Sequence, residues 1–290
     1  MKRTIAKLLA LSLAVTAVAG LSVTASADED NVITVAASST PHAEILEAAR
    51  ETLEAEGWEL DVEIFSDYVQ PNTVVAEGEI LVNYFQHTPY LDEFNEEYGT
   101  DIVSVAKIHY EPFGIYPGTK SSLDELEDGD VIAVPNDVTN EARALLLLEA
   151  NGVLTLNEDA GLTATINDIE SYSVDVEILE VEAAQVSQYT PEVALVVLNG
   201  NYALEAGLSV ANDAIAYETS DSEAATTYAN IIAVKAGNED NEGVQALVAV
   251  LQSDEIKDYI NETYDGAVLP YEETAEDEAA DEVETEAVTE

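Results

Sequence analysis

Residues 131–145 read VIAVPNDVTNEARAL, and this stretch decides the fold. Its first part, Val131–Pro135, is a short run of β-branched and small apolar residues that ends at a proline, a pattern typical of a buried strand. A polar turn follows, and the apolar residues from Ala144 onward predict a helix that ends near Asn151-Gly152. A helix that begins just after the carboxyl end of a strand offers free backbone N–H groups where ligands bind in open α/β sheets.

Outward from this stretch, strand and helix patterns alternate along the chain. A strand at 33–37, an amphipathic helix that ends at Gly57 and a strand at 60–65 form a βαβ unit, which implies parallel strands. Further strands are predicted at 80–84, 102–108, 174–181, 193–198 and 228–234, and closing helices at 244–251 and 255–264. The body of roughly 240 residues exceeds the usual size of one hydrophobic core, so the sequence predicts two α/β lobes.

The expected domain organisation has two connections between the lobes. Each lobe should be a mostly parallel sheet flanked by helices, and the chain should cross between them near residues 110 and 226. A basic start, an apolar run and Ala25-Ser26-Ala27 predict a secretory signal peptide, with a membrane anchor as the alternative. The divisions are a signal peptide at 1–27, a first lobe at 28–111 and 227–270, a second lobe at 112–226, and a disordered acidic tail at 271–290.

Charge and cysteine content exclude several classes of partner. Nine Lys and Arg stand against sixty Asp and Glu, which gives a net charge of −51. A protein without a basic surface is not expected to bind nucleic acid or anionic lipid. The chain contains no Cys, which excludes disulfides and a thioether-linked lipid. We therefore expect an exported protein, periplasmic or at the cell surface, that is not lipid-anchored through Cys.

Signatures of catalysis are missing from the sequence. It contains no phosphate-binding loop, no dinucleotide fingerprint and no nucleophile elbow, and its three His residues lack metal-site spacing. In a chain with sixty carboxylates, pairs of acidic residues arise by chance at any spacing, so they do not indicate a catalytic site. The sequence thus predicts a binding protein with no cofactor and no metal, rather than an enzyme.

Polar and aromatic residues gather just after the predicted strands. In a doubly wound sheet these positions converge on one crevice. An arginine offers a bidentate fork for a carboxylate, asparagines offer both acceptors and donors to a zwitterion, and aromatic rings offer a flat apolar wall that suits a thioether. The candidate site residues are Tyr68, Phe85, His87, Tyr90, Glu111, Asn140, Arg143, Asn199 and Asn201.

Each candidate also has a structural interpretation. Arg143 could form an ion pair with Glu141 or Asp137, and Asn140 could only cap its helix. The two asparagines that flank Gly200 could only shape a turn. The aromatic residues could belong to the core, the histidine could be structural, and the glutamate before Pro112 could be a hinge residue.

Three separated stretches carry a resemblance to a known family. They are residues 83–91, NYFQHTPYL, residues 132–148, IAVPNDVTNEARALLLL, and residues 199–203, NGNYA. With them the chain resembles the methionine-binding lipoprotein family, the NlpA type of substrate-binding protein for ABC transporters. The similarity runs from about residue 31 to residue 270.

The resemblance implies a fold and a function. It implies a two-lobed periplasmic-binding-protein type II fold that closes on free methionine and delivers it, as a monomer, to a membrane permease driven by an ATPase. Arg143 would hold the ligand carboxylate and Glu111 its amino group. Asn140 and Asn199, with Asn201, would hold the polar head, while Tyr68, Phe85 and His87 would enclose the thioether. The alternatives are another small amino acid, a methionine-containing dipeptide or an exported enzyme.

Overall fold

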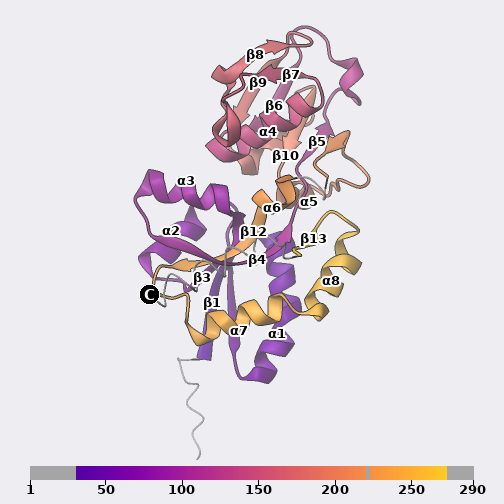
Figure 1. The fold of residues 1–290 in the computed structure, drawn as a ribbon. Helices are drawn as coiled ribbons and strands as arrows, with labels where there is room; N and C mark the ends of the chain where they lie inside the picture. The colour runs from indigo at the N-terminus through magenta and orange to yellow at the C-terminus, as the bar shows by residue number, and fades with distance from the viewer. Residues whose placement is uncertain (1–30, 220–222, 273–290) are drawn as a thin grey trace, which may run out of the picture.

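The structure is a computed structural model that describes residues 31–219 and 223–272. The predicted signal peptide and nearly all of the predicted acidic tail lie outside the described residues. The chain forms two lobes, one above the other in Figure 1. Indigo N-terminal and yellow C-terminal segments share the lower lobe, and the middle of the chain forms the upper one.

The first lobe contains a six-stranded sheet in the order β13-β4-β12-β3-β1-β2. Its strands are β1 (Val32–Ala37), β2 (Glu59–Ile64), β3 (Val82–His87), β4 (Ile102–Tyr110), β12 (Ala229–Lys235) and β13 (Leu269–Pro270). Its helices are α1 (Glu44–Glu56), α2 (Gln70–Glu77), α3 (Thr88–Tyr98), α7 (Glu242–Leu251) and α8 (Asp254–Tyr264), with a short turn η2 (Ser39–Ala43) before α1.

The second lobe contains a five-stranded sheet in the order β11-β5-β10-β6-β9 and a separate hairpin, β7-β8. Its strands are β5 (Gly114–Pro117), β6 (Val131–Pro135), β7 (Leu154–Leu156), β8 (Ile169–Tyr172), β9 (Glu177–Val181), β10 (Leu195–Leu198) and β11 (Ala216–Tyr217). Its helices are α4 (Val138–Ala150) and α5 (Gly200–Glu205), and its 3₁₀ turns are η3 (Leu123–Glu125), η4 (Gly161–Thr163), η5 (Ile166–Asp168) and η6 (Ala183–Tyr189). Helix α6 (Glu223–Thr227) lies on the segment that returns to β12.

Both lobes follow from the alternation of apolar and polar residues in the sequence. In α1 the buried residues Ile45, Leu46, Ala49 and Leu53 form one face, and the helix ends at Gly57, whose φ of 96° is left-handed. These side chains join β1, α7 and α8 in the largest core cluster. Helices α2 and α3 pack on the opposite side of the sheet around Val75. The sheet is therefore covered on both faces, which is why β12 is buried almost throughout.

Both sheets are mixed, although the sequence predicted mostly parallel ones. Strands β1, β2 and β3 pair in parallel, whereas β12 runs antiparallel to β3 and β4. In the second lobe β6, β9 and β10 pair in parallel, and β5 runs antiparallel to β10. Of the strands that pair antiparallel, β5, β11 and β12 lie next to the connections between the lobes, and β13 lies near the end of the described chain. The sequence did not predict β5, β7, β8, β11 or β13, because strands of two to four residues carry almost no periodicity.

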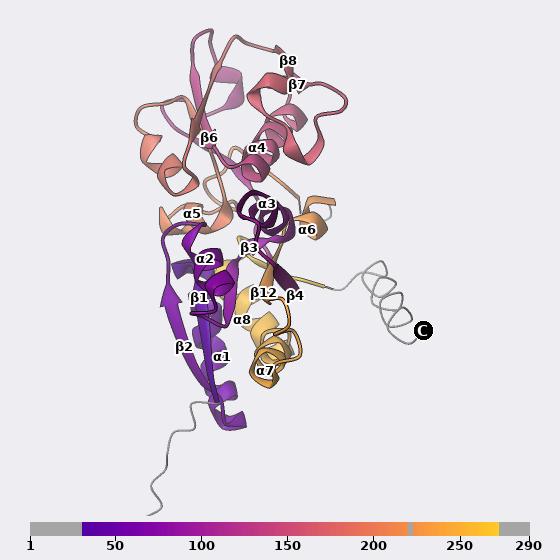
Figure 2. The same ribbon diagram turned by 90° about the vertical axis from the view of Figure 1, so that its left-hand side faces the viewer.

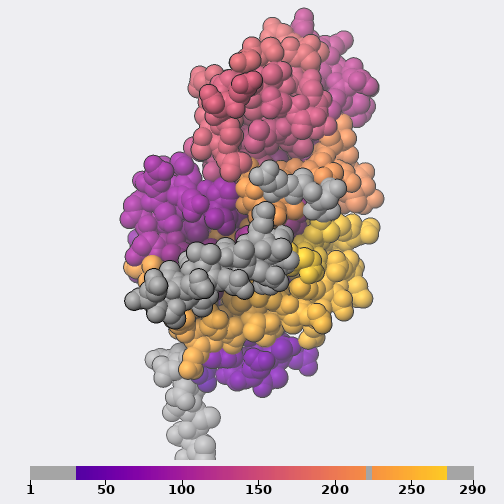
Figure 3. Space-filling model, viewed as in Figure 1, coloured from indigo at the N-terminus to yellow at the C-terminus, as the bar shows by residue number. Residues whose placement is uncertain are grey.

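The two connections position the functional region. Strand β4 in the first sheet is followed after three residues by β5 in the second, and the chain returns between β11 and β12. Helices α5 and α6 lie at the level where the lobes meet in both ribbon views (Figures 1 and 2). In the space-filling view the lobes are two masses, with orange residues at their junction (Figure 3). No helix within the described ranges has the length and apolar character needed to span a membrane.

Candidate functional site

All nine residues that the sequence singled out line one cavity at the junction of the lobes. The cavity has a volume of about 20 Å³, roughly the space of one water molecule, so its side chains nearly fill it. The remaining lining residues are Gln86, Gly200 and Asn230. Sequence reasoning missed these three. Asn230 did leave a signal, because it is a polar residue inside the otherwise apolar strand β12.

An aromatic wall forms one side of the cavity. The ring of Tyr68 lies 5.7 Å from that of Phe85 and 5.6 Å from that of Tyr90, and Phe85 and Tyr90 meet edge to face. Tyr68 comes from the loop after β2, Phe85 from the end of β3, and Tyr90 from the first turn of α3. Rings in this arrangement present both faces and edges, which suits an apolar or thioether side chain.

His87 ends β3 and is neutral. Burial, reinforced by the charge of Arg143, lowers the pKa of His87 to about 3. Its Nδ1 accepts a hydrogen bond from the backbone N–H of Tyr90 at 3.2 Å, so the proton lies on Nε2. That Nε2 lies 3.2 Å from Oδ1 of Asn140 in the other lobe. The imidazole therefore links the lobes through a neutral hydrogen bond.

The first turn of α4 holds Asn140 in the cavity. The helix is capped by Asp137, whose Oδ1 accepts hydrogen bonds from the backbone N–H and the side-chain Nδ2 of Asn140, at 3.1 and 2.7 Å. Asn140 is thus not the cap. Its Oδ1 accepts a hydrogen bond from Nδ2 of Asn199 at 2.8 Å. The side-chain amides of Asn140 and Asn199, which follow strands β6 and β10, therefore hold each other in position.

Two buried atoms at the cavity have no protein partner. Oδ1 of Asn199 and Nδ2 of Asn201 are buried and make no hydrogen bond within the described part of the chain. The second amide is held through its oxygen, which accepts a hydrogen bond from the Tyr68 hydroxyl at 2.6 Å. A buried unpaired donor or acceptor costs about 1–3 kcal/mol. One free acceptor and one free donor in the lining of the same cavity are suited to a ligand that carries both kinds of group.

Arg143 is buried, with 4% of its side chain exposed, and its partner is neither Glu141 nor Asp137. Its Nε and Nη2 donate to Oε1 and Oε2 of Glu218 at 2.8 and 2.6 Å. The sequence predicted a fork open to a ligand carboxylate, but Glu218 occupies one edge of that fork. Burial lowers the pKa of Arg143, but the charge and hydrogen bonds of Glu218 raise it above its ordinary value overall, so the guanidinium stays charged.

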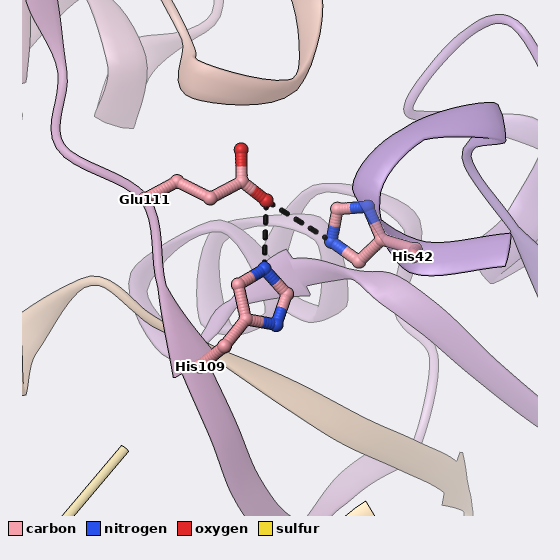
Figure 4. Close-up of side chains that lie close together, drawn as sticks. All are labelled: His42, His109 and Glu111. Atoms are coloured by element: carbon pink, nitrogen blue, oxygen red, sulfur yellow. Dashed lines mark hydrogen bonds and ion pairs between the residues drawn. The ribbon is translucent and has the colours of Figure 1, made fainter. Parts of the chain in front are cut away.

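Glu111 is held by two imidazoles, as Figure 4 shows. Its Oε1 accepts a hydrogen bond from Nε2 of His109 at 2.8 Å and lies 3.4 Å from Nε2 of His42. The hydroxyl of Tyr84 bonds Nδ1 of His109, and Nε2 of His42 donates to Oδ1 of Asn230 at 2.9 Å. His109 thus supports Glu111 by a hydrogen bond, and His42 supports Asn230 in the same way while lying close to the Glu111 carboxylate.

The trio of His42, His109 and Glu111 has donor atoms within 4.8 Å of one another, close enough to hold a metal ion. The hydrogen bonds already use the imidazole nitrogens that face the carboxylate, since each carries its proton there. Burial lowers the pKa of His42 to about 4 and that of His109 to about 3, so both are neutral. Burial also raises the pKa of Glu111, while His42, Arg143 and the backbone N–H of Asn201 act in the opposite direction. In the described part of the chain Nδ1 of His42 is the one imidazole nitrogen of the trio without a hydrogen-bond partner.

Gly200 allows the two lobes to approach at Glu111. A Cβ added to Gly200 would lie 2.6 Å from Cβ and 2.7 Å from Oε2 of Glu111. We expect Gly200→Ala to push the carboxylate away from the cavity and to lower ligand affinity at least tenfold in calorimetry. The exposed end of the same helix offers the control Ala206→Ser, which should bind as the wild type does. Unchanged affinity in Gly200→Ala would contradict the close approach.

A family model described as NlpA lipoprotein matches residues 33–272. The chain belongs to the NlpA lipoprotein family. The resemblance drawn from the three sequence stretches is therefore confirmed, and so is the two-lobed fold, which solved structures of relatives share.

Three members of the NlpA lipoprotein family illustrate the similarity. The methionine-binding lipoprotein MetQ of Bacillus subtilis is 41% identical over 245 residues, which cover 83% of this chain and 88% of that protein. The crystal structure of a lipoprotein from Ruminococcus gnavus has 67% identity and a TM-score of 0.83, covering 83% of this chain and all of the other. The structure of a nutrient binding protein from Burkholderia cenocepacia bound to methionine has 39% identity and a TM-score of 0.78, with the same coverages.

Membership of the NlpA lipoprotein family bears on two further expectations. The relatives are named as binding proteins and not as enzymes, in agreement with the sequence. The expectation of a protein that is not lipid-anchored is wrong, because the family and its members are named lipoproteins. That expectation rested on the absence of Cys from the 290 residues alone.

Proposed function

We propose that this protein is the extracytoplasmic substrate-binding protein of an ABC importer, which binds free methionine between its lobes and delivers it to the membrane permease. The observation that carries the proposal is the pair of unpartnered buried atoms, Oδ1 of Asn199 and Nδ2 of Asn201, in a cavity that also has an aromatic wall. An amino acid with an apolar side chain supplies an ammonium, a carboxylate and an apolar body in one small molecule. The relative from Burkholderia cenocepacia, whose structure is described as bound to methionine, adds support.

We infer a role for each cavity residue from its chemistry. Arg143 attracts the ligand carboxylate, and Glu111 attracts the ammonium. The amides of Asn140, Asn199 and Asn201 complete the hydrogen bonds of the polar head. The thioether lies against the aromatic wall of Tyr68, Phe85 and Tyr90, with His87 beside it.

The lobe boundaries belong to the same proposal. We infer a first lobe of residues 28–111 and 227–270 and a second lobe of residues 112–226. In support, β4 and β12 belong to one sheet and β5 and β11 to the other, so the connections fall at residues 111–113 and 218–228. Rotation about two such segments would open and close the cavity. The protein would act as a monomer with the permease and ATPase subunits.

Isothermal titration calorimetry with L-methionine tests the proposal. The protein should first be unfolded and refolded, so that any ligand carried through purification is removed. We expect saturable one-to-one binding of L-methionine by the refolded wild type. No heat of binding with either methionine enantiomer would contradict the proposal.

A thermal-shift panel separates the alternatives. The panel contains the twenty amino acids, D-methionine and short methionine peptides. At a fixed ligand concentration the stabilisation of the folded state grows with the logarithm of the affinity, so the largest shift identifies the preferred compound. A larger shift with a methionine dipeptide than with free methionine would favour a peptide-binding protein. Turnover of the bound compound would favour an enzyme.

A further inference from the structure

The carboxylate of Glu218 is engaged by more groups than an ordinary ion pair. It accepts two hydrogen bonds from Arg143, one from the Tyr110 hydroxyl at 2.6 Å and one from the backbone N–H of Phe113 at 3.0 Å. Only 10% of its side chain is exposed. Tyr110 ends β4 and Phe113 precedes β5, while Glu218 itself lies on the returning segment after β11. One carboxylate therefore joins both connections between the lobes to the arginine of α4.

The contacts of Arg143 leave one part of the guanidinium available. Nη2 donates both to Glu218 and to the backbone carbonyl of Glu111 at 3.0 Å. The hydrogen bonds to Glu218 and to the Glu111 carbonyl use Nε and Nη2, and neither of these acceptors engages Nη1. The aromatic rings of Tyr228 and Phe113 lie 4.2 and 4.8 Å from the guanidinium carbon. Because one edge of the group and its surroundings are fixed, its orientation is set before a ligand arrives.

We propose that Glu218 is a positioning residue, which holds Arg143 so that its Nη1 meets the carboxylate of the ligand. The inference rests on the proposed binding of methionine. The opposite role, in which Glu218 competes with the ligand for Arg143, requires the carboxylate to leave four hydrogen bonds in a nearly dry site. Unpairing a buried charge is unfavourable, so Glu218 stays and the ligand carboxylate meets the free side of the guanidinium.

The test compares L-methionine with L-methioninol, in which CH₂OH replaces the carboxylate. Both are titrated into the refolded wild type and the variant Glu218→Gln, up to millimolar concentrations. A loosely held Arg143 harms only recognition of the carboxylate. We therefore expect the variant to bind L-methionine at least about tenfold more weakly and to bind L-methioninol with little change. Glu192→Gln, which removes an exposed carboxylate, is the control that should match the wild type.

The other possible outcomes would each contradict the inference, and each has a different meaning. Equal losses for both ligands would mean that Glu218 only supports the fold, and tighter binding of L-methionine would mean that it competes with the ligand. Unchanged binding of both would mean that it has no role. Where Glu218→Gln does not fold, as judged by circular dichroism, Glu218→Asp keeps the charge with a shorter reach and should show the same selective loss. A wild type that binds neither compound would instead defeat the proposed function.

Discussion

The variant Arg143→Gln is expected to lose at least about a hundredfold in affinity for L-methionine. The guanidinium is the only buried cationic side chain among the cavity residues, and a carboxylate brought into this site needs a charged partner. Removing one partner of a buried charge pair costs about 3–5 kcal/mol, and each 1.4 kcal/mol corresponds to about tenfold in affinity. Calorimetry on the refolded variant measures the loss directly.

Two further variants show whether that loss comes from the charge or from the fold. Arg143→Lys keeps the charge but not the planar fork that engages Glu218, so its affinity should fall between those of the wild type and Arg143→Gln. Arg50→Gln removes a partly exposed arginine that pairs with Glu47, and it should bind methionine normally. Affinity of Arg143→Gln within threefold of the wild type would contradict the assigned role.

Replacing Glu111 with Gln is expected to raise thermal stability and weaken binding at the same time. Burial raises the pKa of Glu111, so the ionised carboxylate makes the ligand-free fold less stable near neutral pH. The glutamine can still accept the hydrogen bond from His109 without carrying a charge. The same charge is what attracts an ammonium group, so its removal should lower affinity by about tenfold or more. Thermal unfolding and calorimetry together measure both effects.

The pH dependence of the wild type follows from the same carboxyl group. A carboxyl whose pKa is raised by folding stabilises the folded state at low pH, and this contribution is lost as pH rises from the ordinary value of 4.5 through the raised one. Affinity should change in the opposite sense and fall as pH drops through the raised pKa, because protonated Glu111 no longer attracts an ammonium. Asp137 and Glu141 also have raised pKa values, so only the difference between wild type and Glu111→Gln reports on Glu111.

Comparing the affinities of the wild type and Glu111→Gln at each pH therefore tests whether Glu111 binds the ammonium group. The affinity ratio of wild type to Glu111→Gln should approach one at acid pH and grow toward neutral pH. An equal ratio across the range would show that the ionisation of Glu111 does not contribute to binding. A variant less stable than the wild type at neutral pH would show that the imidazoles compensate the buried charge more fully than its raised pKa indicates.

The fold could be predicted where single elements carry a strong local pattern. The stretch from Val131 to Leu145 did become strand β6 and helix α4, because a run of β-branched residues and an apolar helical face are properties of neighbouring residues. The short strands β5 and β11 could not be predicted, since each exists only through its pairing with a distant strand. For the same reason the sequence did not predict the antiparallel strand pairs that make both sheets mixed.

In the site, too, the positions of the residues could be predicted from the sequence but their contacts could not. The positions of Phe85, Asn140 and Asn199 followed from the rule that polar and aromatic groups after parallel strands converge at one edge, and all three do line the cavity. Their partners did not follow from that rule. Asn140 was open to interpretation as a helix cap, and Asp137 proved to fill that role. Which of several nearby polar residues caps a helix depends on backbone geometry that residue type alone leaves undetermined.

By itself the sequence determined the longer strands and helices, the placement of the candidate residues at strand ends and the family. Only the tertiary structure decided what each candidate contacts. Arg143 and Glu218 are 75 residues apart in the chain, and nothing local to either predicts that they meet. The imidazoles of His42 and His109 reach Glu111 from different elements of the first lobe. The physical reason is that periodicity records which face of an element is buried, whereas the partner of a buried charge is set by how distant elements pack together.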